Sequence, residues 1–325
     1  FAVVGLGAAA YAPAKYGLVT ELVPARQLVA ANGWLEVSVV AAVLLGTASG
    51  GALVSQLWLQ GPAAALAAPL GLSALQVSLL AVMGVYALAA LLNRGVPDSG
   101  ARYPAPARHP LRLTREFARD NRRLWRDREG GLSLAATTIF WGVGATLQFI
   151  VLRWAVERMG LALSQAALLQ GVVALGVVAG ATAAGRWVPL AAAPRLLGCG
   201  VLLGLAMPAL ALAPNLWVAV PLLVLAGATG GLMVVPLNAL LQHRGFELLT
   251  AGRSIAVQGF NENASVLAML AGYAALVALD VPLRWLMAGF GLAIAAAITR
   301  LWWRAARWPA ATAGASPATV RPRSG

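Results

Sequence analysis

The sequence predicts an all-α polytopic membrane protein, and three observations support this fold class. Hydrophobic residues make up 60% of the 325 residues and charged residues only 11%, with a mean hydropathy of +0.77, whereas soluble domains carry about 25% charged residues. Apolar runs of about 20 residues, long enough to cross a hydrocarbon core about 30 Å thick, recur along the chain. Finally, two apolar stretches resemble each other, as in transporters built from two related halves.

The apolar runs predict one partial span followed by eight full membrane helices. The partial span covers 1–12, and the full spans lie near 29–54, 70–92, 131–155, 165–188, 195–213, 216–241, 254–279 and 282–303. Gly46 and Gly50 in the first full span form a small-xxx-small face, which lets another helix approach closely. The chain starts inside an apolar stretch without an initiator Met, so we expect its N-terminus to be truncated.

The basic residues predict the orientation of these spans. If the helices alternate, 21 of the 24 Lys and Arg residues lie on one side of the membrane, and the remaining three are Arg153, Arg158 and Arg284. The positive-inside rule makes the first side cytoplasmic. The net charge of +13 therefore reflects topology and gives no reason to expect a nucleic-acid partner, although the basic face could attract anionic membrane lipids.

Two segments are polar. Residues 93–130 predict a basic cytoplasmic linker, in which Leu111 to Trp125 could form an amphipathic helix with Phe117 and Leu124 on its apolar side. Such a helix would lie on the inner membrane surface, and the alternative is a solvated linker. Residues 304–325 are rich in Pro, Ala and Arg and predict a disordered cytoplasmic tail.

The repeat gives the architecture. Asn32 and Glu36 recur as Gln258 and Glu262, and each pair follows a proline, Pro13 or Pro236, that we expect to mark a helix end. Residues 131–303 hold six spans, and 1–92 match the end of a fourth helix, a fifth and a sixth. Two six-helix halves, with most of the first four helices missing here, resemble the major facilitator superfamily.

Longer motifs narrow the resemblance. The strings are GAAAYAPAKYG (7–17), ANGWLE (31–36), FWG (140–142), VPLNALLQ (235–242) and AVQ (256–258) followed by Glu262 and Asn263. Together they resemble the bacterial lysophospholipid transporters, from residue 1 to about 303. The resemblance implies an inner-membrane carrier or flippase that moves lysophospholipids, such as 2-acyl-glycerophosphoethanolamine, to the cytoplasmic leaflet. There a partner acyltransferase/acyl-carrier-protein synthetase would reacylate them.

One position departs from the family pattern. In that family an arginine follows a Thr-Leu pair in the seventh helix, whereas this chain has Gln148 there and an arginine at Arg153. If the family arginine holds the substrate phosphate, either Arg153 replaces it or the head-group contact differs. Arg153 could equally extend to the outer interface, and Gln148 could line the cavity.

Glu36 and Glu262 are the main candidates for the substrate path. Each lies about eight residues into its predicted span, which at 1.5 Å per residue is about 12 Å deep, and an ionisable group there is expensive. Asn32 and Gln258 precede them by four residues and so share their helix faces. The carboxylates could hold a head-group ammonium or a coupling cation, or they could serve only to join helices.

Two other polar residues lie at similar levels. Lys15, the sole lysine, follows Pro13 and could contact a phosphate leaving toward the cytoplasm, or it could anchor the helix at the inner interface. Asn238 follows Pro236 within an apolar helix and could line the cavity or bond a neighbouring helix.

Other classes of function have little support in the sequence. A single cysteine, Cys199, and two histidines, His109 and His243, in polar connections give no metal cluster, so we expect no metal, cofactor or catalytic residue. A membrane acyltransferase or hydrolase would need an embedded nucleophile or base. The main alternative is a carrier of another amphipathic or cationic solute, and a further one is that this chain alone is inactive.

Overall fold

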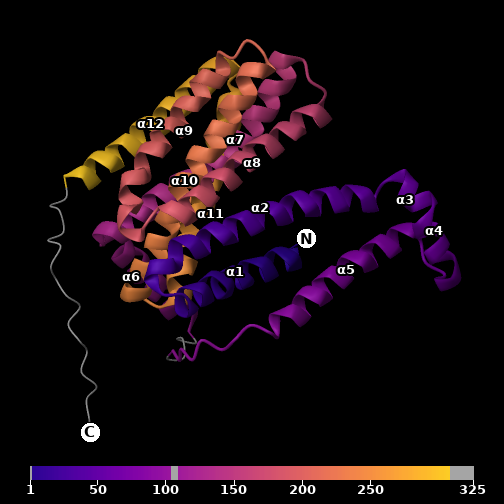
Figure 1. Ribbon diagram of the computed structural model, residues 1–325, viewed down its shortest axis with the longest axis horizontal. Coiled ribbons are helices and arrows are strands. Elements are labelled where there is room, and N and C mark those ends of the chain that lie inside the picture. The colour runs from indigo at the N-terminus through magenta and orange to yellow at the C-terminus, as the bar shows by residue number, and fades with distance from the viewer. Residues whose placement is uncertain (1, 104–108, 308–325) are drawn as a thin grey trace, which may run out of the picture.

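The computed structural model describes residues 2–103 and 109–307, and these residues form helices and no strands (Figure 1). The tail expected at 304–325 is helical to Ala306, and its remainder from residue 308 lies outside the described residues. Part of the irregular stretch expected before the amphipathic helix, residues 104–108, lies outside them as well.

The first part of the chain contains three long helices. They are α1 (Ala2–Leu22), α2 (Leu28–Leu53) and α5 (Ala74–Asn93). A 3-10 turn, η1 (Ala25–Gln27), precedes α2, and α3 (Gln56–Gln60), α4 (Pro62–Ala67) and η2 (Ala68–Leu70) connect α2 to α5. Helices α2 and α5 extend away from the rest of the molecule (Figure 1).

The second part is a bundle of six helices preceded by α6 (Pro110–Arg126). The bundle consists of α7 (Arg128–Met159), α8 (Leu163–Trp187), α9 (Leu197–Ala211) with the 3-10 segment η3 (Leu190–Leu196) before it, α10 (Leu216–Leu248), α11 (Ala251–Ala278) and α12 (Leu283–Ala306). Two buried apolar clusters follow one another along the bundle and include Trp154 and Met287 in one and Met233 and Leu237 in the other.

Seven helices of the described residues are long and apolar enough to cross a membrane. The protein is therefore a multi-pass membrane protein. Helix α11 has 28 residues, enough for a span. Its composition is less apolar because Gln258, Asn261, Glu262 and Asn263 interrupt it, and two of these side chains are functional candidates.

The two prolines expected at helix ends lie inside helices, so that expectation was wrong. Helix α1 continues through Pro13 to Leu22, and α10 continues through Pro236 to Leu248. A proline removes one backbone hydrogen bond and crowds the preceding turn, but neighbouring helices in a membrane protein make this tolerable. The helices thus extend past the positions where their apolar runs become polar.

Glycines set the closest helix contacts. In the bundle, α8 and α10 touch through Gly176 and Gly227, and a Cβ added at either would collide with the backbone of the other helix. Helix α2 packs on α8 in the same way, since a Cβ on Gly33 would lie 2.9 Å from the Ala181 carbonyl oxygen. Gly46 and Gly50, the pair suggested by the sequence, have no described atom near their Cβ positions. The close approach therefore falls nearer the start of α2.

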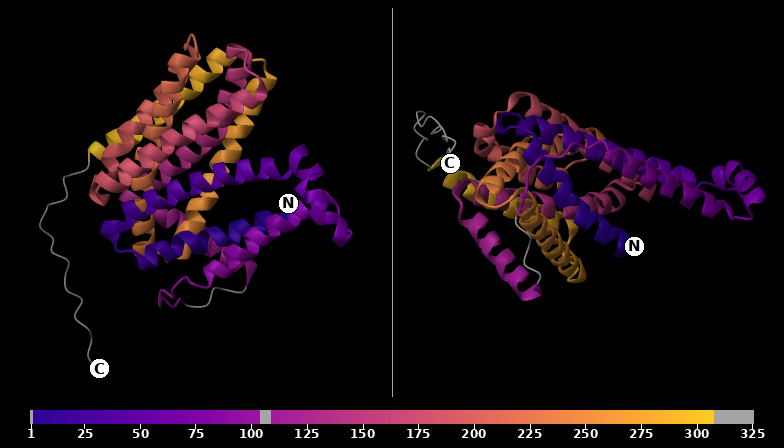
Figure 2. Two further views of the ribbon diagram at one scale, coloured as in Figure 1. Left: turned by 45° about the vertical axis from the view of Figure 1, so that its right-hand side comes forward. Right: turned by 90° about the horizontal axis from the view of Figure 1, so that it is seen from below.

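Helix α6 packs against the ends of α7, α10 and α11, alongside the bundle (Figure 2). Its apolar residues Phe117 and Leu124 join a cluster with Leu134, Leu241 and Val257, and Phe117 stacks edge-to-face on Phe260 with ring centroids 5.1 Å apart. Arg253 of α11 binds Glu116 and Asp120 of α6 at 2.9 and 3.2 Å. The helix is thus held by protein contacts along its apolar side.

The turn between α6 and α7 is fixed by Asp127. Its carboxylate caps α7 by accepting a hydrogen bond from the Gly130 amide at 2.7 Å, and it accepts two from the Arg244 guanidinium at 2.7 and 3.2 Å. Partial burial opposes ionisation of this carboxyl, but these hydrogen bonds outweigh it and lower the pKa of Asp127.

Candidate functional site

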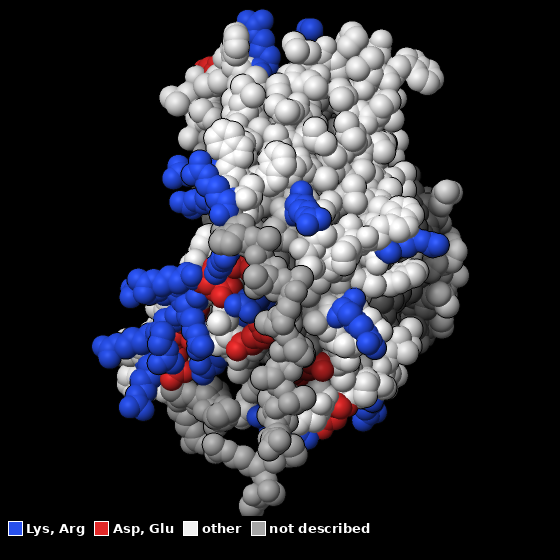
Figure 3. Space-filling model, turned by 60° about the vertical axis from the view of Figure 1, so that its left-hand side comes forward, with Lys and Arg blue, Asp and Glu red and all other residues white. Residues whose placement is uncertain are grey.

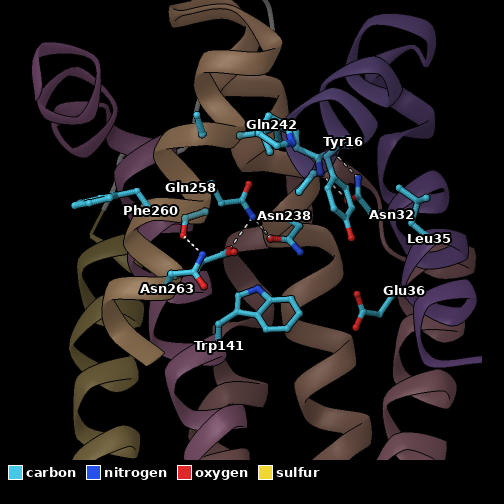
Figure 4. A pocket seen from close by; sticks show the side chains of 16 residues that line it. Tyr16, Asn32, Leu35, Glu36, Trp141, Asn238, Gln242, Gln258, Phe260 and Asn263 are labelled. Carbon is cyan, nitrogen blue, oxygen red and sulfur yellow. Dashed lines mark hydrogen bonds between the residues drawn. The ribbon is translucent and has the colours of Figure 1, made fainter. Parts of the chain in front are cut away.

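A cavity of about 380 Å³ opens where α1 and α2 meet the bundle. Five helices contribute to its wall: α1, α2, α7, α10 and α11 (Figure 4). The lining contains five side-chain amides and both carboxylates of the repeat, namely Asn32, Asn238, Gln242, Gln258, Asn263, Glu36 and Glu262. Five of the eight residues that the sequence suggested for a substrate path therefore lie around one cavity.

Asn32 and Gln242 close one side of the cavity by pairing their amides. The Asn32 side chain donates to Gln242 Oε1 at 2.8 Å, and the Gln242 side chain donates back to Asn32 Oδ1 at 2.9 Å. Both side chains are buried, at 5% and 2% exposure. Because the residues are 210 positions apart, this pair joins α2 directly to α10.

A second polar cluster lies on α10 and α11. The Gln258 amide nitrogen donates to Asn238 Oδ1 at 3.0 Å and to Glu262 Oε1 at 2.8 Å. The four-residue spacing of Gln258 and Glu262 thus brings the amide to the carboxylate, which confirms that part of the helical-face argument. The buried Oε1 of Gln258 has no hydrogen-bond partner in the described residues, so an acceptor remains unmet at this site.

Glu36 is placed differently from Glu262. The side chain of its helix neighbour Asn32 is hydrogen-bonded to Gln242. Glu36 itself makes no hydrogen bond or ion pair with the described residues. Its carboxylate faces the cavity, and the Tyr16 hydroxyl points into the same space (Figure 4). Glu36 therefore offers an unsatisfied carboxylate to whatever occupies the cavity.

Lys15 lies beside this cavity and does not line it. Its ammonium nitrogen lies 5.2 Å from the centroid of the Tyr16 ring, a distance typical of a cation–π contact. Lys15 is also near enough to Glu36 for electrostatic attraction. No lysine or arginine is among the lining residues of the described cavity, so its wall carries acidic groups and amides.

Part of the cavity wall is apolar. Trp141 of α7, Leu35 of α2, Phe260 of α11 and Pro13 of α1 are among the apolar lining residues. Trp141 is 37% exposed, and its indole lies across the cavity from Glu36 (Figure 4). The cavity thus combines a polar cluster with aromatic and aliphatic surface, a composition that suits an amphipathic ligand.

The structure does not bring Gln148 and Arg153 to this cavity. Gln148 is exposed on α7 and its backbone carbonyl accepts a hydrogen bond from the Gln170 side chain at 2.9 Å. Arg153 pairs with Glu157, one helical turn further along α7, in a separate hollow that also contains Tyr273. Within the described residues, these two groups are therefore separate from the two carboxylates.

Three further residues line the cavity although the sequence did not indicate them as site residues: Gln242, Tyr16 and Trp141. Gln242 follows Asn238 by four residues, the same spacing as Asn32 and Glu36, and this pattern could have identified it. Trp141 and Tyr16 lie in apolar surroundings, where packing explains an aromatic residue equally well. The structure also has no group of His, Cys, Asp or Glu suited to a metal ion within the described residues.

Comparison with known proteins agrees with the helical fold and with the position of this cavity. Residues 1–271 match the family profile of the Major Facilitator Superfamily. The chain belongs to the major facilitator superfamily. Members of this superfamily bind solutes between two helical halves, and the cavity lies where the first helices of this superfamily chain meet its six-helix bundle.

Curated relatives are similar over most of this major-facilitator chain. The protein named lysophospholipid transporter LplT from Yersinia enterocolitica is 41% identical over 283 residues, which are 87% of this chain and 66% of that protein. The proteins of the same name from Yersinia pestis and Yersinia pseudotuberculosis have the same identity and coverage. The chain therefore spans less than two thirds of the length of these relatives. No solved structure matches it.

Proposed function

We propose that this chain is part of a secondary carrier that moves lysophospholipids across a membrane. The observation that carries the proposal is the cavity that combines two carboxylates and several amides with an aromatic and aliphatic wall. A lysophospholipid has one charged head group and one acyl chain, and such a wall offers surface for both. The name of the Yersinia relatives, lysophospholipid transporter, supports the same substrate class.

In this proposal the polar cluster binds the head group. Glu36 and Glu262 would hold the ammonium of an ethanolamine head group, since the lining contains two carboxylates and no basic residue. A buried carboxylate is stabilised when a cation pairs with it, and Glu36 makes no hydrogen bond or ion pair with the described residues.

The phosphate and the acyl chain would then lie on opposite sides of the carboxylates. Lys15 is the basic residue beside the cavity and would meet the phosphate as it leaves. Trp141, Leu35 and Phe260 would contact the chain. Arg153 and Gln148 have no role in this arrangement because they lie outside the cavity.

The membrane arrangement is also part of the proposal. Residues 1–92 would belong to one half and 131–303 to the other, and 93–130 and the tail would face the cytoplasm because most arginines lie there. The membrane would be the bacterial inner membrane. Delivery to its cytoplasmic leaflet would supply a reacylating partner, an acyltransferase/acyl-carrier-protein synthetase.

A second candidate is a carrier of organic cations. The two carboxylates in a cavity without lining cations favour it, and such a ligand would need neither a phosphate contact nor a long apolar wall. Competition separates the two functions. Excess choline or another quaternary ammonium would block uptake by a cation carrier, and excess lysophosphatidylethanolamine would block uptake by a lipid carrier.

The test is uptake of labelled lysophosphatidylethanolamine into spheroplasts. We would compare the chain as given with a fusion that carries the corresponding N-terminal helices of a Yersinia relative. The fusion should take up the lipid, and Glu36→Gln or Glu262→Gln should abolish uptake at normal protein level. The matched control is Glu157→Gln, because Glu157 lies outside the cavity and pairs with Arg153. Unchanged uptake in both cavity variants would refute head-group binding by Glu36 and Glu262. No uptake by a correctly inserted fusion would refute the proposal that the protein carries lysophospholipids.

A further inference from the structure

A second cleft lies between the start of α7 and the end of α12, away from the cavity described above. Its volume is about 380 Å³. Gly131, Leu132 and Ala135 of α7 and Leu301 of α12 form its apolar part. Arg128 at the start of α7 and Arg304 and Arg307 at the end of α12 also line it, together with Trp125 and Asp127. The cleft thus has an apolar part beside three guanidinium groups.

The charge balance of this cleft is positive. Its one acidic residue, Asp127, is already bonded by Arg244 at 2.7 Å and by the Gly130 amide. Arg304 and Arg307 are exposed, and their side chains form no hydrogen bond or ion pair with the described residues. Guanidinium groups bind phosphate oxygens through paired hydrogen bonds. The side chains of Arg304 and Arg307 are therefore suited to hold an anion in this cleft.

Tryptophans indicate the level of the cleft in the membrane. Trp125 borders it with 42% exposure, and Trp302 and Trp303, next to its α12 wall, are 42% and 62% exposed. Exposed tryptophans concentrate at the head-group level of membranes. Basic residues gather over the part of the surface near α6, and the larger part of this face is uncharged (Figure 3). The cleft thus lies where a lipid phosphate and the beginning of its acyl chains meet.

We propose that this cleft binds the head group of an anionic phospholipid of the inner leaflet, with the phosphodiester on Arg304 and Arg307 and the first part of the acyl chains along Leu132, Ala135 and Leu301. The site is separate from the transport cavity, because the two have no lining residue in common. An anionic lipid fits better than a zwitterionic one because the acidic residue among the described lining, Asp127, is already paired with Arg244 and so is not free to bind an ammonium. Basic pockets between membrane helices on the cytoplasmic side commonly bind such lipids.

The test uses the delipidated full chain in detergent with dioleoyl-phosphatidylglycerol as the probe. Native mass spectrometry across a lipid titration gives the dissociation constant, and dioleoyl-phosphatidylcholine is the zwitterionic comparison. Arg304→Gln/Arg307→Gln should weaken phosphatidylglycerol binding about thirty-fold, since two basic residues near a lipid surface contribute about 1 kcal/mol each. Arg304→Lys/Arg307→Lys should retain most of the binding, which also shows that the α12 end still folds.

The matched control is Arg112→Gln/Arg115→Gln. It removes the same charge from exposed positions of α6 that lie outside the cleft, and it should change the dissociation constant less than two-fold. Equal weakening in both double variants would mean general attraction to a basic surface and would overturn the site. Equal retention of phosphatidylcholine and phosphatidylglycerol by the original chain would overturn it as well. The readout does not depend on transport, so a failed uptake assay leaves this result interpretable.

Discussion

The paired amides of Asn32 and Gln242 should be energetically coupled, and this coupling can be measured. Replacing Asn32 by Leu leaves the Gln242 amide buried without its partner, and Gln242→Met does the same to Asn32. An unmet buried polar group costs about 1–3 kcal/mol. Interhelical hydrogen bonds in a membrane protein average about 0.6 and reach about 1.7 kcal/mol. Two reciprocal bonds at 2.8 and 2.9 Å therefore predict a coupling free energy of about 1–3 kcal/mol.

The assay is a double-mutant cycle on the free energy of unfolding. The protein in dodecyl maltoside micelles is titrated with sodium dodecyl sulfate, and tryptophan fluorescence follows the loss of structure. Each single variant should lose about 1–3 kcal/mol. Asn32→Leu/Gln242→Met should lose no more than one single variant, because two apolar side chains of similar shape leave no unmet group.

A matched pair checks that the cycle reports contact. Asn263 bonds the carbonyl of Gly259 within its own helix, at 2.7 Å, so Asn32→Leu/Asn263→Leu should be additive within about 0.5 kcal/mol. If Asn32→Leu/Gln242→Met is also additive, the amides are not coupled. The inference that this pair fastens α2 to α10 would then be refuted.

Three further predictions follow from the packing and the charges. Gly33→Val should lower the free energy of unfolding by about 1–3 kcal/mol in the same titration, because its Cβ would lie 2.9 Å from the Ala181 carbonyl oxygen; Gly46→Val, in open space on the same helix, should change it by less than about 0.5 kcal/mol. Phe117→Ala should release α6 and speed its cleavage by trypsin several-fold in limited proteolysis, and unchanged cleavage would contradict the docking of that helix. Hydrogen bonds lower the pKa of Asp127 below its ordinary value of 3.8, so its stabilising contribution is complete above that value and disappears as the pH falls below it. Asp127→Asn should flatten the stability profile in this acid range, and an equally steep profile would exclude Asp127 as its cause.

Much of the fold could be predicted because the bilayer limits the choices. Eight predicted full spans coincide with long helices to within a few residues at most ends, since apolar length is a direct signal in a membrane protein. The errors occur where polar sequence remains helical. Helix α10 continues past residue 241 because α6 and α7 cover it and Arg244 binds Asp127. Contacts of this kind, between residues far apart in the sequence, produce no periodic pattern in the sequence.

The candidate site was predictable in part for a similar reason. The repeat identified the helices that carry Glu36 and Glu262, and helical spacing related each carboxylate to an amide four residues earlier. Spacing within one helix could not show that the Asn32 side chain would form its hydrogen bonds with Gln242, because that contact depends on how α2 packs against α10. Nor could it separate Arg153 from the cavity, since the Glu157 side chain that pairs with it is an ordinary helical neighbour.

The two copies of the repeat differ in the side chains that surround their carboxylates. Counting from Pro13 and Pro236, Lys15 in the first copy corresponds to Asn238 in the second. The Gln258 amide donates hydrogen bonds to Asn238 and to Glu262. In the second copy, neutral amides therefore lie next to the carboxylate. In the first copy the amide Asn32 is committed to Gln242, and the cation Lys15 lies on the Tyr16 ring near Glu36. On one side of the cavity, the Glu262 carboxylate is thus hydrogen-bonded by an amide. On the other side, the Glu36 carboxylate lies near the Lys15 ammonium. In the proposed lysophospholipid carrier, this asymmetry would offer one partner to the ammonium of a zwitterionic head group and another to its phosphate.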